Sequence, residues 1–348
     1  DEEDADGFAD LLAGTRARRQ ELLSASAELG AMAAASYASL TQSNAGPAKV
    51  APTLALTKTA PEEKKSLTSV HAHRASHEDL LAKAFDDIGQ QRFDAALKQV
   101  DALIAREPNF QLAHMIRGDL LLARVRPISK MGDVPNAQAG KANERVDDLR
   151  AEAIARLRAL RERPNDDQVP RYLLQMPADQ KHAVVVDTSR SRLYVYENNL
   201  KRIRLVNDFY ISIGKQGAVK VREGDQKTPV GVYHVTSSVP KQKLTDFYGA
   251  GAFPINYPND WDKRNGRNGH GIWLHGTPSN TYSRAPRASD GCVVLSNADL
   301  NLLADNLQLG KTAVVISERV EWRSGEEIVR ERDEILAALE RWRIDWES

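Results

Sequence analysis

The sequence predicts an α+β protein of several domains: a helical N-terminal region, a mostly β domain and a C-terminal helix. Three observations predict this class. Apolar residues recur at helical spacing up to about residue 165, alternate with polar residues between residues 179 and 320, and return to helical spacing near the C-terminus. The chain has 348 residues, 41% of them hydrophobic, so it is long enough to form a sizeable core.

Charge and hydropathy exclude several classes of partner. Lys+Arg and Asp+Glu both number 48, so the chain as a whole gives no electrostatic reason to expect nucleic acid or an anionic membrane as a partner. No stretch approaches the roughly 18 consecutive apolar residues that a membrane-spanning helix requires. We therefore expect no membrane span in this chain.

The N-terminal part divides into a helix, a linker and a helical domain. Residues 1–35 are rich in Ala, Leu, Arg and Glu at broadly helical spacing, which predicts one helix. Residues 36–75 turn to Ala, Ser, Thr, Pro and Lys without periodicity, a composition typical of a flexible linker. Residues 76–165 predict a helical domain, with apolar faces before and after Gly89 and a further helix that Pro164 ends.

One helical hairpin in this domain resembles a tetratricopeptide repeat. The resemblance rests on Ala96, Val100, Leu103 and Pro108, and no second clear copy follows. An ordinary helical hairpin remains an equal alternative. If this region has a function of its own, we expect it to bind a protein partner.

Residues 179–320 predict one mostly β domain. The stretch "HAVVVDTSRSRLYVYENN" indicates two strands joined by a polar turn, and "KRIRLVNDFYISIG" indicates a third. A Gly-Asp turn and a Thr-Pro-x-Gly sequence precede a β-branched strand, and "GIWLHG" is a short strand that ends at a glycine. A short helix over residues 297–306 and the strand "KTAVVIS" close the domain.

The chain holds a single cysteine, Cys292, within "ASDGCVVL". One thiol can form neither an internal disulfide nor a thiolate zinc cluster, so it is either a small buried hydrophobe or a reactive nucleophile. A nucleophilic cysteine needs a base, usually histidine, and all eight histidines precede Cys292, which excludes the papain-like order. The best candidate base is His275, at the end of the "GIWLHG" strand.

The residues around these two side chains suit acyl transfer. Gly276 lets the chain turn directly after His275, and the turn formed by Ser289, Gly291 and Cys292 brings the thiol toward the same groove. We expect the backbone amides of Gly291 and Cys292 to point at a developing oxyanion. For His275 alone, the alternative is a structural histidine hydrogen-bonded at a strand end.

Two motifs carry a resemblance to a known family. The stretch "LHGTPSNTYSRAPRASDGC", residues 274–292, resembles the His-Gly and Ser-x-Gly-Cys signature of the L,D-transpeptidase (YkuD-like) catalytic domain. The stretch "EGDQKTPVGVYHV", residues 223–235, resembles the Gly-Asp-x-x-Thr-Pro-x-Gly motif of that family. The resemblance covers about residues 180–318 and implies a β sandwich. It also implies a periplasmic enzyme of the bacterial envelope that acts on peptidoglycan stem peptides without a cofactor.

The resemblance further implies a mechanism. Cys292, with His275 as its base, attacks the meso-diaminopimelate carbonyl at its bond to the terminal D-alanine and forms a thioester, while the Gly276 carbonyl orients the imidazole. An amine from a second stem completes L,D-transpeptidation, whereas water makes the protein an L,D-carboxypeptidase. An amidase on the same scaffold, a non-catalytic peptidoglycan-binding scaffold protein and, ranked last, a sortase are the alternatives. The acyl acceptor and the oligomeric state stay open.

The chain departs from the family pattern at two positions. Asp290 stands where many members carry His or Lys, and Val294 stands where many carry Arg or Asn. A carboxylate directed at the thiol would raise the pKa of that thiol, so we expect Asp290 to point away. Val294 removes an implied polar contact to substrate or loop.

Several further residues are candidates for binding. We expect Tyr257 and Trp273 to wall the groove, and Arg284 and Arg287 to pair with stem-peptide carboxylates. The alternatives are solvated loop arginines and a core position for Trp273. We expect no metal site at the H-x-H-x3-H pattern, because its histidines sit at the edge of the linker: His71, His73 and His77.

The C-terminal part carries a second resemblance. The stretch "FPINYPNDWDKRNGRNGHGIWLHG" resembles family members that carry a C-terminal nuclear-transport-factor-2-like domain, and "ILAALERWRIDWES" resembles the first helix of such a domain. Residues 325–348 are predicted to form a helix that exposes Trp342 and Trp346 and needs a partner surface. We expect the natural chain to continue beyond Ser348; the alternative is a terminal helix that packs back on the β domain.

Overall fold

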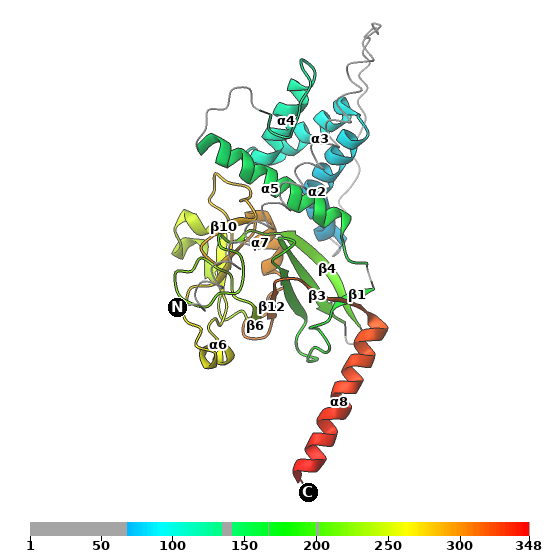
Figure 1. The fold of residues 1–348 in the computed structure, drawn as a ribbon, viewed down its shortest axis with the longest axis vertical. Helices are drawn as coiled ribbons and strands as arrows, with labels where there is room; N and C mark the ends of the chain where they lie inside the picture. Colours follow the sequence, from blue (N-terminus) through cyan, green and yellow to red (C-terminus); the bar gives the residue numbers. More distant parts are fainter. Residues whose placement is uncertain (1–67, 134–140, 166, 200–201, 348) are drawn as a thin grey trace, which may run out of the picture. The chain divides into compact units, whose positions relative to one another are not determined.

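The computed structural model describes residues 68–133, 141–165, 167–199 and 202–347 (Figure 1). They fall into two compact units that meet between Arg150 and Ala151, and each unit is described by itself. The predicted N-terminal helix, residues 1–35, and most of the predicted linker, residues 36–75, lie outside the described residues.

The first unit consists of helices. In chain order they are α2 (Thr68–Gly89), α3 (Phe93–Arg106), α4 (Gln111–Leu122) and the first half of α5 (Lys141–Arg161). Helix α3 contacts both α2 and α4. Its buried residues Ala96, Val100 and Leu103 are among those that the helical spacing places on one face.

Helix α2 begins earlier than the sequence pattern predicts. It starts at Thr68, so residues 68–75 are helical, although their composition predicts that they belong to the linker. Residues 68–76 have no apolar periodicity, which is why the pattern misses them. They also contain no Pro or Gly, so nothing stops a helix that extends from the apolar turns around Leu80.

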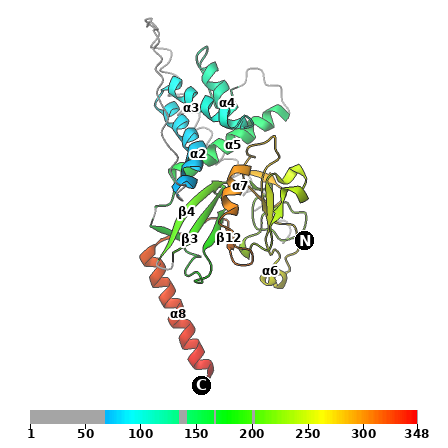
Figure 2. The ribbon, with the colours of Figure 1, turned by 180° about the vertical axis from the view of Figure 1, so that it is seen from behind.

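A five-stranded sheet forms one layer of the second unit. Its strand order is β4-β3-β2-β12-β6, and all neighbours are antiparallel except the parallel pair β2 and β12. Figure 2 labels β4, β3 and β12 of this sheet from behind, and β2 lies between β3 and β12. The strands are β2 (His182–Asp187), β3 (Arg192–Asn198), β4 (Ile203–Tyr210), β6 (Gly231–His234) and β12 (Ala313–Ser317).

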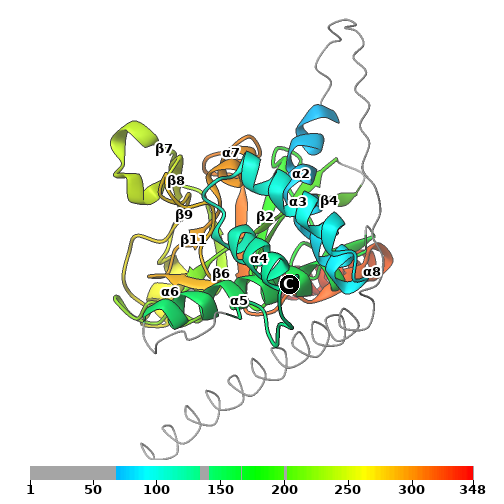
Figure 3. The same ribbon diagram turned by 90° about the horizontal axis from the view of Figure 1, so that it is seen from above.

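A four-stranded sheet forms the second layer; His275 lies on its strand β9, and Cys292 directly precedes its edge strand β11. Its order is β11-β9-β8-β7, as Figure 3 shows, with β11 parallel to β9 and the other neighbours antiparallel. The strands are β7 (Val239–Pro240), β8 (Gly251–Pro254), β9 (Trp273–His275) and β11 (Val293–Val294).

Short elements connect the layers. Strand β5 (Ile213–Gly214) pairs in parallel with β10 (Arg287–Ser289), which leads into the cysteine turn. The short helices are η2 (Lys241–Lys243), η3 (Asp246–Tyr248), α6 (Asp260–Arg264) and α7 (Asn297–Ala304). Ser296 caps α7, because its side chain accepts a hydrogen bond from the Asp299 amide at 3.1 Å.

The five-stranded sheet is buried on both faces, which explains the unbroken apolar run of β2. Val184 and Val186 belong to the core between the two layers, whereas Ala183 and Val185 belong to a core on the opposite face. Leu274 of β9 and Val293 of β11 are fully buried in the first core. Each such side chain contributes about 1.5–3 kcal/mol by its burial, so the register of β9 against β11 is firmly set.

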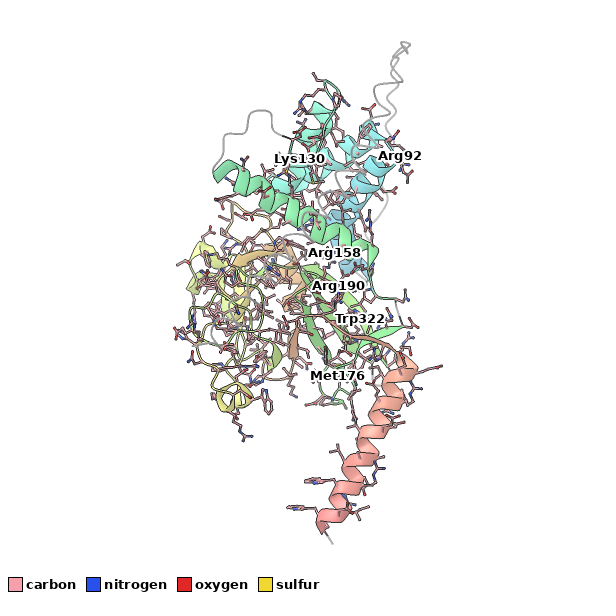
Figure 4. All side chains as sticks on the ribbon, viewed as in Figure 1. Arg92, Lys130, Arg158, Met176, Arg190 and Trp322 are labelled. Atoms are coloured by element: carbon pink, nitrogen blue, oxygen red, sulfur yellow. The ribbon has the colours of Figure 1, made fainter. Side chains whose placement is uncertain are left out.

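The β structure extends beyond the predicted limits of residues 179–320. Strand β1 (Gln168–Pro170) pairs antiparallel with β13 (Trp322–Ser324), and the Trp322 indole, labelled in Figure 4, packs edge-on against Tyr194 with 5.0 Å between ring centroids. The sequence places these strands outside the domain because three-residue strands carry too little alternation to be read. The predicted α+β class, with helices before and after a β-rich domain in the chain, is confirmed.

Helix α8 (Gly325–Glu347) follows β13 directly, as predicted for the C-terminal residues. It contacts β1 and β13, and Ile328 is its buried residue. Trp342 and Trp346 are 63% and 78% exposed, and their rings stack at 6.0 Å, so this end of the helix does not pack back on the β domain. Among the helices of the described residues, none combines the length and the apolar character needed to cross a membrane.

Candidate active site

Cys292 sits in a tight turn between β10 and β11 and is partly exposed. The Ser289 hydroxyl donates to the Cys292 carbonyl at 2.6 Å and accepts from the Gly291 amide at 3.1 Å. Ser289 is itself 4% exposed. The serine of the Ser-x-Gly-Cys motif therefore clamps the turn that presents the thiol.

The turn corrects one expectation about oxyanion binding. The Gly291 amide donates to Ser289 Oγ, so it is already engaged inside the turn and does not point at a substrate carbonyl. A role for the Cys292 amide stays a prediction.

Gly291 is required by both its conformation and its surroundings. Its φ is +130°, and a Cβ at this position would lie 2.8 Å from the Lys227 carbonyl oxygen. We expect Gly291→Ala to lower the free energy of unfolding by about 2–4 kcal/mol, because backbone strain of about 1–3 kcal/mol adds to the close contact. Urea unfolding followed by circular dichroism measures the loss.

Gly266→Ala is the matched control for this prediction. Gly266 also has a left-handed φ of +69°, but a Cβ there would meet no atom within 4 Å. We expect this variant to lose only about 1–2 kcal/mol. Equal losses in the two variants would show that the approach of Lys227 to the cysteine turn does not matter for stability.

His275 ends β9 and is 1% exposed. Its Nδ1 lies 2.7 Å from the Gly276 carbonyl oxygen. Because a carbonyl oxygen only accepts, Nδ1 carries the proton and Nε2 of the neutral ring keeps its lone pair. The ring is thus held in the tautomer that a general base requires, by the carbonyl that the family resemblance implies.

Strand pairing relates the histidine and the cysteine through two neighbouring strands of the four-stranded sheet. In the parallel pair of β9 and β11, Val293 lies opposite Leu274 and Val294 lies opposite His275. Cys292, one residue before β11, is therefore one strand across and two residues back from His275, or about 8 Å between Cα atoms.

The environment keeps both groups neutral near pH 7. Burial lowers the pKa of His275 to about 4, although the hydrogen bond to Gly276 opposes this shift. Burial also raises the pKa of the Cys292 thiol, although the Trp273 amide and the Arg284 guanidinium favour the thiolate. The resting pair is accordingly a thiol beside an imidazole, not a thiolate beside an imidazolium, so the proton must move as the sulfur attacks.

Asp290 points away from the thiol, as expected. Its carboxylate accepts from Lys215 Nζ at 2.8 Å and from Gln226 Nε2 at 3.2 Å, and its side chain is 66% exposed. Its remaining charge still contributes to raising the pKa of Cys292, after the larger effect of burial. Lys215 is therefore the partner that keeps this carboxylate from binding near the sulfur.

The backbone of residues 271–273 cradles the thiol. Cys292 Sγ lies 3.3 Å from the Gly271 carbonyl oxygen, to which the neutral thiol donates. The Trp273 amide hydrogen-bonds to the sulfur and stabilises the thiolate. One segment thus holds the thiol before the reaction and stabilises the anion that develops during it.

An aromatic cluster covers the imidazole. The rings of Phe247 and Tyr248 lie 5.9 and 5.1 Å from the His275 ring, and Tyr248 lies 4.9 Å from Trp273. Trp273 is half-buried in this cluster, and its place in the wall of the groove stays a prediction. No periodicity in "TDFYGA" marks Phe247 and Tyr248 as site residues. The only pattern that points to them is an aromatic pair before a glycine.

Tyr257 does not wall the groove, and that expectation is corrected. Its side chain is 5% exposed, its ring packs edge-on against Tyr233 at 5.9 Å, and its hydroxyl donates to the Asn268 carbonyl at 2.9 Å. The residue belongs to the core between the two sheets. A sequence cannot separate a wall tyrosine from a core tyrosine, because both suit an amphipathic ring.

The two candidate arginines differ in position. The Arg284 guanidinium lies 4.6 Å from the Phe247 ring centroid, and its charge lowers the pKa of both His275 and Cys292 after the larger effects of burial. The Arg284 charge therefore acts on both reacting groups. Arg287 is exposed on β10, and its guanidinium passes near Gly217 instead.

A family model for the L,D-transpeptidase catalytic domain, YkuD, matches residues 181–316. These residues form a YkuD domain. A comparison with curated proteins finds no match.

Three solved structures are similar to the chain. Bd1075 of Bdellovibrio bacteriovorus shares 34% identity over 52% of this chain and 64% of its own, with a TM-score of 0.46. The helical cell shape determining protein Pgp2 of Campylobacter jejuni shares 32% identity over 49% of this chain and 57% of its own, with a TM-score of 0.41. An L,D-transpeptidase of Mycobacterium smegmatis shares 14% identity over 39% of this chain and 58% of its own, with a TM-score of 0.27. The chain therefore spans less than two thirds of each of these proteins, and the nuclear-transport-factor-2-like subgroup stays a prediction.

The second motif of the YkuD domain braces the cysteine turn. Thr228 is fully buried; its hydroxyl donates to the Gly291 carbonyl at 3.0 Å and accepts from the Gly214 amide at 2.9 Å. Asp225 pairs with Lys220 at 2.8 Å. Burial alone would raise the pKa of Asp225, but hydrogen bonds from Lys220 and three backbone amides outweigh it and lower the pKa to about 2.

Asn297 of the YkuD domain is a further residue that the sequence analysis misses. Its side chain accepts from the Ala250 amide and donates to the Thr277 carbonyl, both at 2.8 Å. A Cβ at Gly276 would collide with Asn297 Oδ1. The glycine after the histidine therefore leaves room for the Asn297 side chain. No local pattern marks the residue, because its partners come from two distant loops.

No metal site is visible in the part of the chain that the structure describes, where no three His, Cys, Asp or Glu side chains converge. His77 lies 3.7 Å from Glu107, and the side chains of His71 and His73 are not among those described.

Proposed function

We propose that the YkuD domain is a cysteine acyltransferase that acts on the tetrapeptide stems of peptidoglycan in the periplasm. The observation that carries the proposal is a partly exposed Cys292 one strand across from the buried His275, whose Nδ1 is fixed by the Gly276 carbonyl. That tautomer leaves Nε2 as the base for a neutral thiol. The family match supports the choice of substrate.

The reaction proceeds in two steps. As Cys292 Sγ bonds to the meso-diaminopimelate carbonyl carbon, its proton passes to His275 Nε2; the carbon–nitrogen bond to D-alanine then breaks, and the imidazolium returns the proton to the leaving amine. The thioester that remains is attacked by an amine of a second stem, which gives a 3,3 cross-link and restores the thiol.

Arg284 and the aromatic cluster supply the binding surface. The guanidinium lies over Phe247 and its charge acts on the thiol, so it can pair with a carboxylate of the stem peptide. Phe247 is 49% exposed and offers its ring to the apolar part of the stem. Arg287, exposed on β10, is a second and more distant carboxylate contact.

Hydrolysis is the second candidate, favoured by Val294. This residue is 2% exposed and pairs with His275 across β9 and β11, so it offers no polar group to an acceptor amine. Water in place of that amine makes the domain an L,D-carboxypeptidase. An amidase or a silent peptidoglycan-binding scaffold would use the same groove, and a protein partner would bind the helical region.

Incubation with tetrapeptide sacculi, followed by mass spectrometry of the muropeptides, tests the proposal. Dimers joined through diaminopimelate residues are expected for transfer, and tripeptides without dimers for hydrolysis. The absence of both products and of free D-alanine would favour the scaffold. Release of D-alanine by Cys292→Ala as well would remove the enzymatic assignment.

A further inference from the structure

Helix α5 places a buried ion pair against the loop that carries Arg284. Glu152 and Arg156, one turn apart on α5, are 2% and 3% exposed, and Arg156 Nε donates to Glu152 Oε1 at 2.9 Å. Both belong to the same compact unit as the sheets, which begins at Ala151. A buried pair of this kind costs much desolvation and is weak evidence for stability, so its value has to be sought in the geometry that it fixes.

The pair reaches two consecutive residues of the loop. Ser283 Oγ donates to Glu152 Oε1 at 2.7 Å. The Arg156 guanidinium lies over the Tyr210 ring at 4.0 Å from its centroid, and the Tyr210 hydroxyl donates to the Arg284 carbonyl at 2.9 Å. Tyr210, at the end of β4, is 4% exposed, so the loop is held from a rigid strand and a rigid helix together.

The other end of the loop is fixed near the histidine. The Thr277 hydroxyl donates to the Thr281 carbonyl at 2.6 Å, and Thr277 is 1% exposed. With the loop held at both ends, the Arg284 side chain extends over Phe247 toward the thiol and the imidazole. Neither Glu152 nor Arg156 takes part in the proposed reaction.

We propose that Glu152 and Arg156 of α5 are positioning residues, which act through Ser283 and Tyr210 to hold Arg284 where it attracts an anionic group to Cys292. The inference rests on the proposed function, since it takes Arg284 as the carboxylate contact. It makes the last turns of α5 part of the substrate-recognition apparatus rather than a mere connection between units.

The single cysteine allows a direct test in the full chain. Iodoacetate and iodoacetamide each alkylate a thiolate: a sulfur–carbon bond forms, and the carbon–iodine bond breaks with release of iodide. The two reagents differ in charge, so the ratio of their rates at one pH reports the positive potential at Cys292, and the thiolate fraction cancels. We expect Arg284→Ala to lower the iodoacetate-to-iodoacetamide ratio about fivefold, as for a partly exposed charge pair.

The positioning variants should reproduce part of that loss. Tyr210→Phe and Ser283→Ala each remove one hydroxyl, and we expect each to lower the ratio about twofold and Glu152→Gln about threefold, since each loosens the loop without removing Arg284. Tyr196→Phe is the matched control: this tyrosine is fully buried, and its hydroxyl reaches the Gln168 carbonyl far from the loop. We expect it to leave the ratio unchanged.

The outcomes separate this proposal from the proposed function. Folded Tyr210→Phe and Ser283→Ala variants with the ratio of the unaltered protein would overturn the positioning role, even if Glu152→Gln failed to fold. An unchanged ratio in Arg284→Ala would overturn it together with the role of Arg284. Absence of muropeptide products alongside the expected ratios would refute the acyltransferase assignment and leave the positioning role standing.

Discussion

Cys292→Ala should leave a folded protein that releases D-alanine from tetrapeptide stems at less than about one-thousandth of the rate of the unaltered chain. No other residue can take over, because the chain has one thiol and the thioester requires it. The fold should survive, because the sulfur is partly exposed and its hydrogen bond goes to the Gly271 carbonyl, not to the core.

Mass spectrometry and thermal unfolding check the two halves of this prediction. The acyl-enzyme mass should appear with the unaltered protein and be absent from the variant, while the melting temperature should change by no more than a few degrees. D-alanine release that continued in the folded variant would contradict the mechanism. A variant that failed to fold would instead show that the thiol is structural.

His275→Ala should slow acylation by about 10²- to 10⁴-fold, the usual contribution of a general base. The alkylation rate of Cys292 by iodoacetamide near pH 7 should change far less. The reason is that burial, not an ion pair, sets the pKa of both groups in the resting site. If the histidine instead held a preformed thiolate, the same substitution would slow alkylation strongly.

The pH profile of acylation follows from the same two shifts. The neutral imidazole is the active form, and its pKa of about 4 lies below the ordinary histidine value of 6.5. Acylation should therefore persist to about pH 4 and fall tenfold per pH unit below it. Stopped-flow acylation across pH 3–8 measures this; an acidic limb near 6.5 would show that the imidazole is not buried during the reaction.

Local sequence patterns predict the nucleophile turn well. Ser289, Gly291 and Cys292 lie within four positions, so their mutual geometry depends on one short turn, and a motif can encode it. The same holds for His275 and Gly276, which are adjacent in the chain and joined by the 2.7 Å contact. Such patterns do not show which backbone amides already donate a hydrogen bond inside the turn, as the Gly291 amide does to Ser289.

Contacts between distant segments are not readable in this way. Phe247 and Tyr248 come to His275 from a 3₁₀ turn, and Asn297 comes from the start of α7. Each depends on how the sheets stack, which one sequence does not specify. Tyr257 shows the converse error, because a residue beside a site in the chain proved to be part of the core.

The sequence by itself predicted the α+β class, the YkuD domain of residues 181–316 and the two residues that carry the proposed chemistry, because periodicity and short motifs are local properties of a chain. The tertiary structure alone decided that thiol and imidazole rest neutral, that Asp290 is held by Lys215, and that α5 reaches the Arg284 loop. Those properties depend on burial and on charges brought together from far apart in the chain, and burial exists only once the segments have packed.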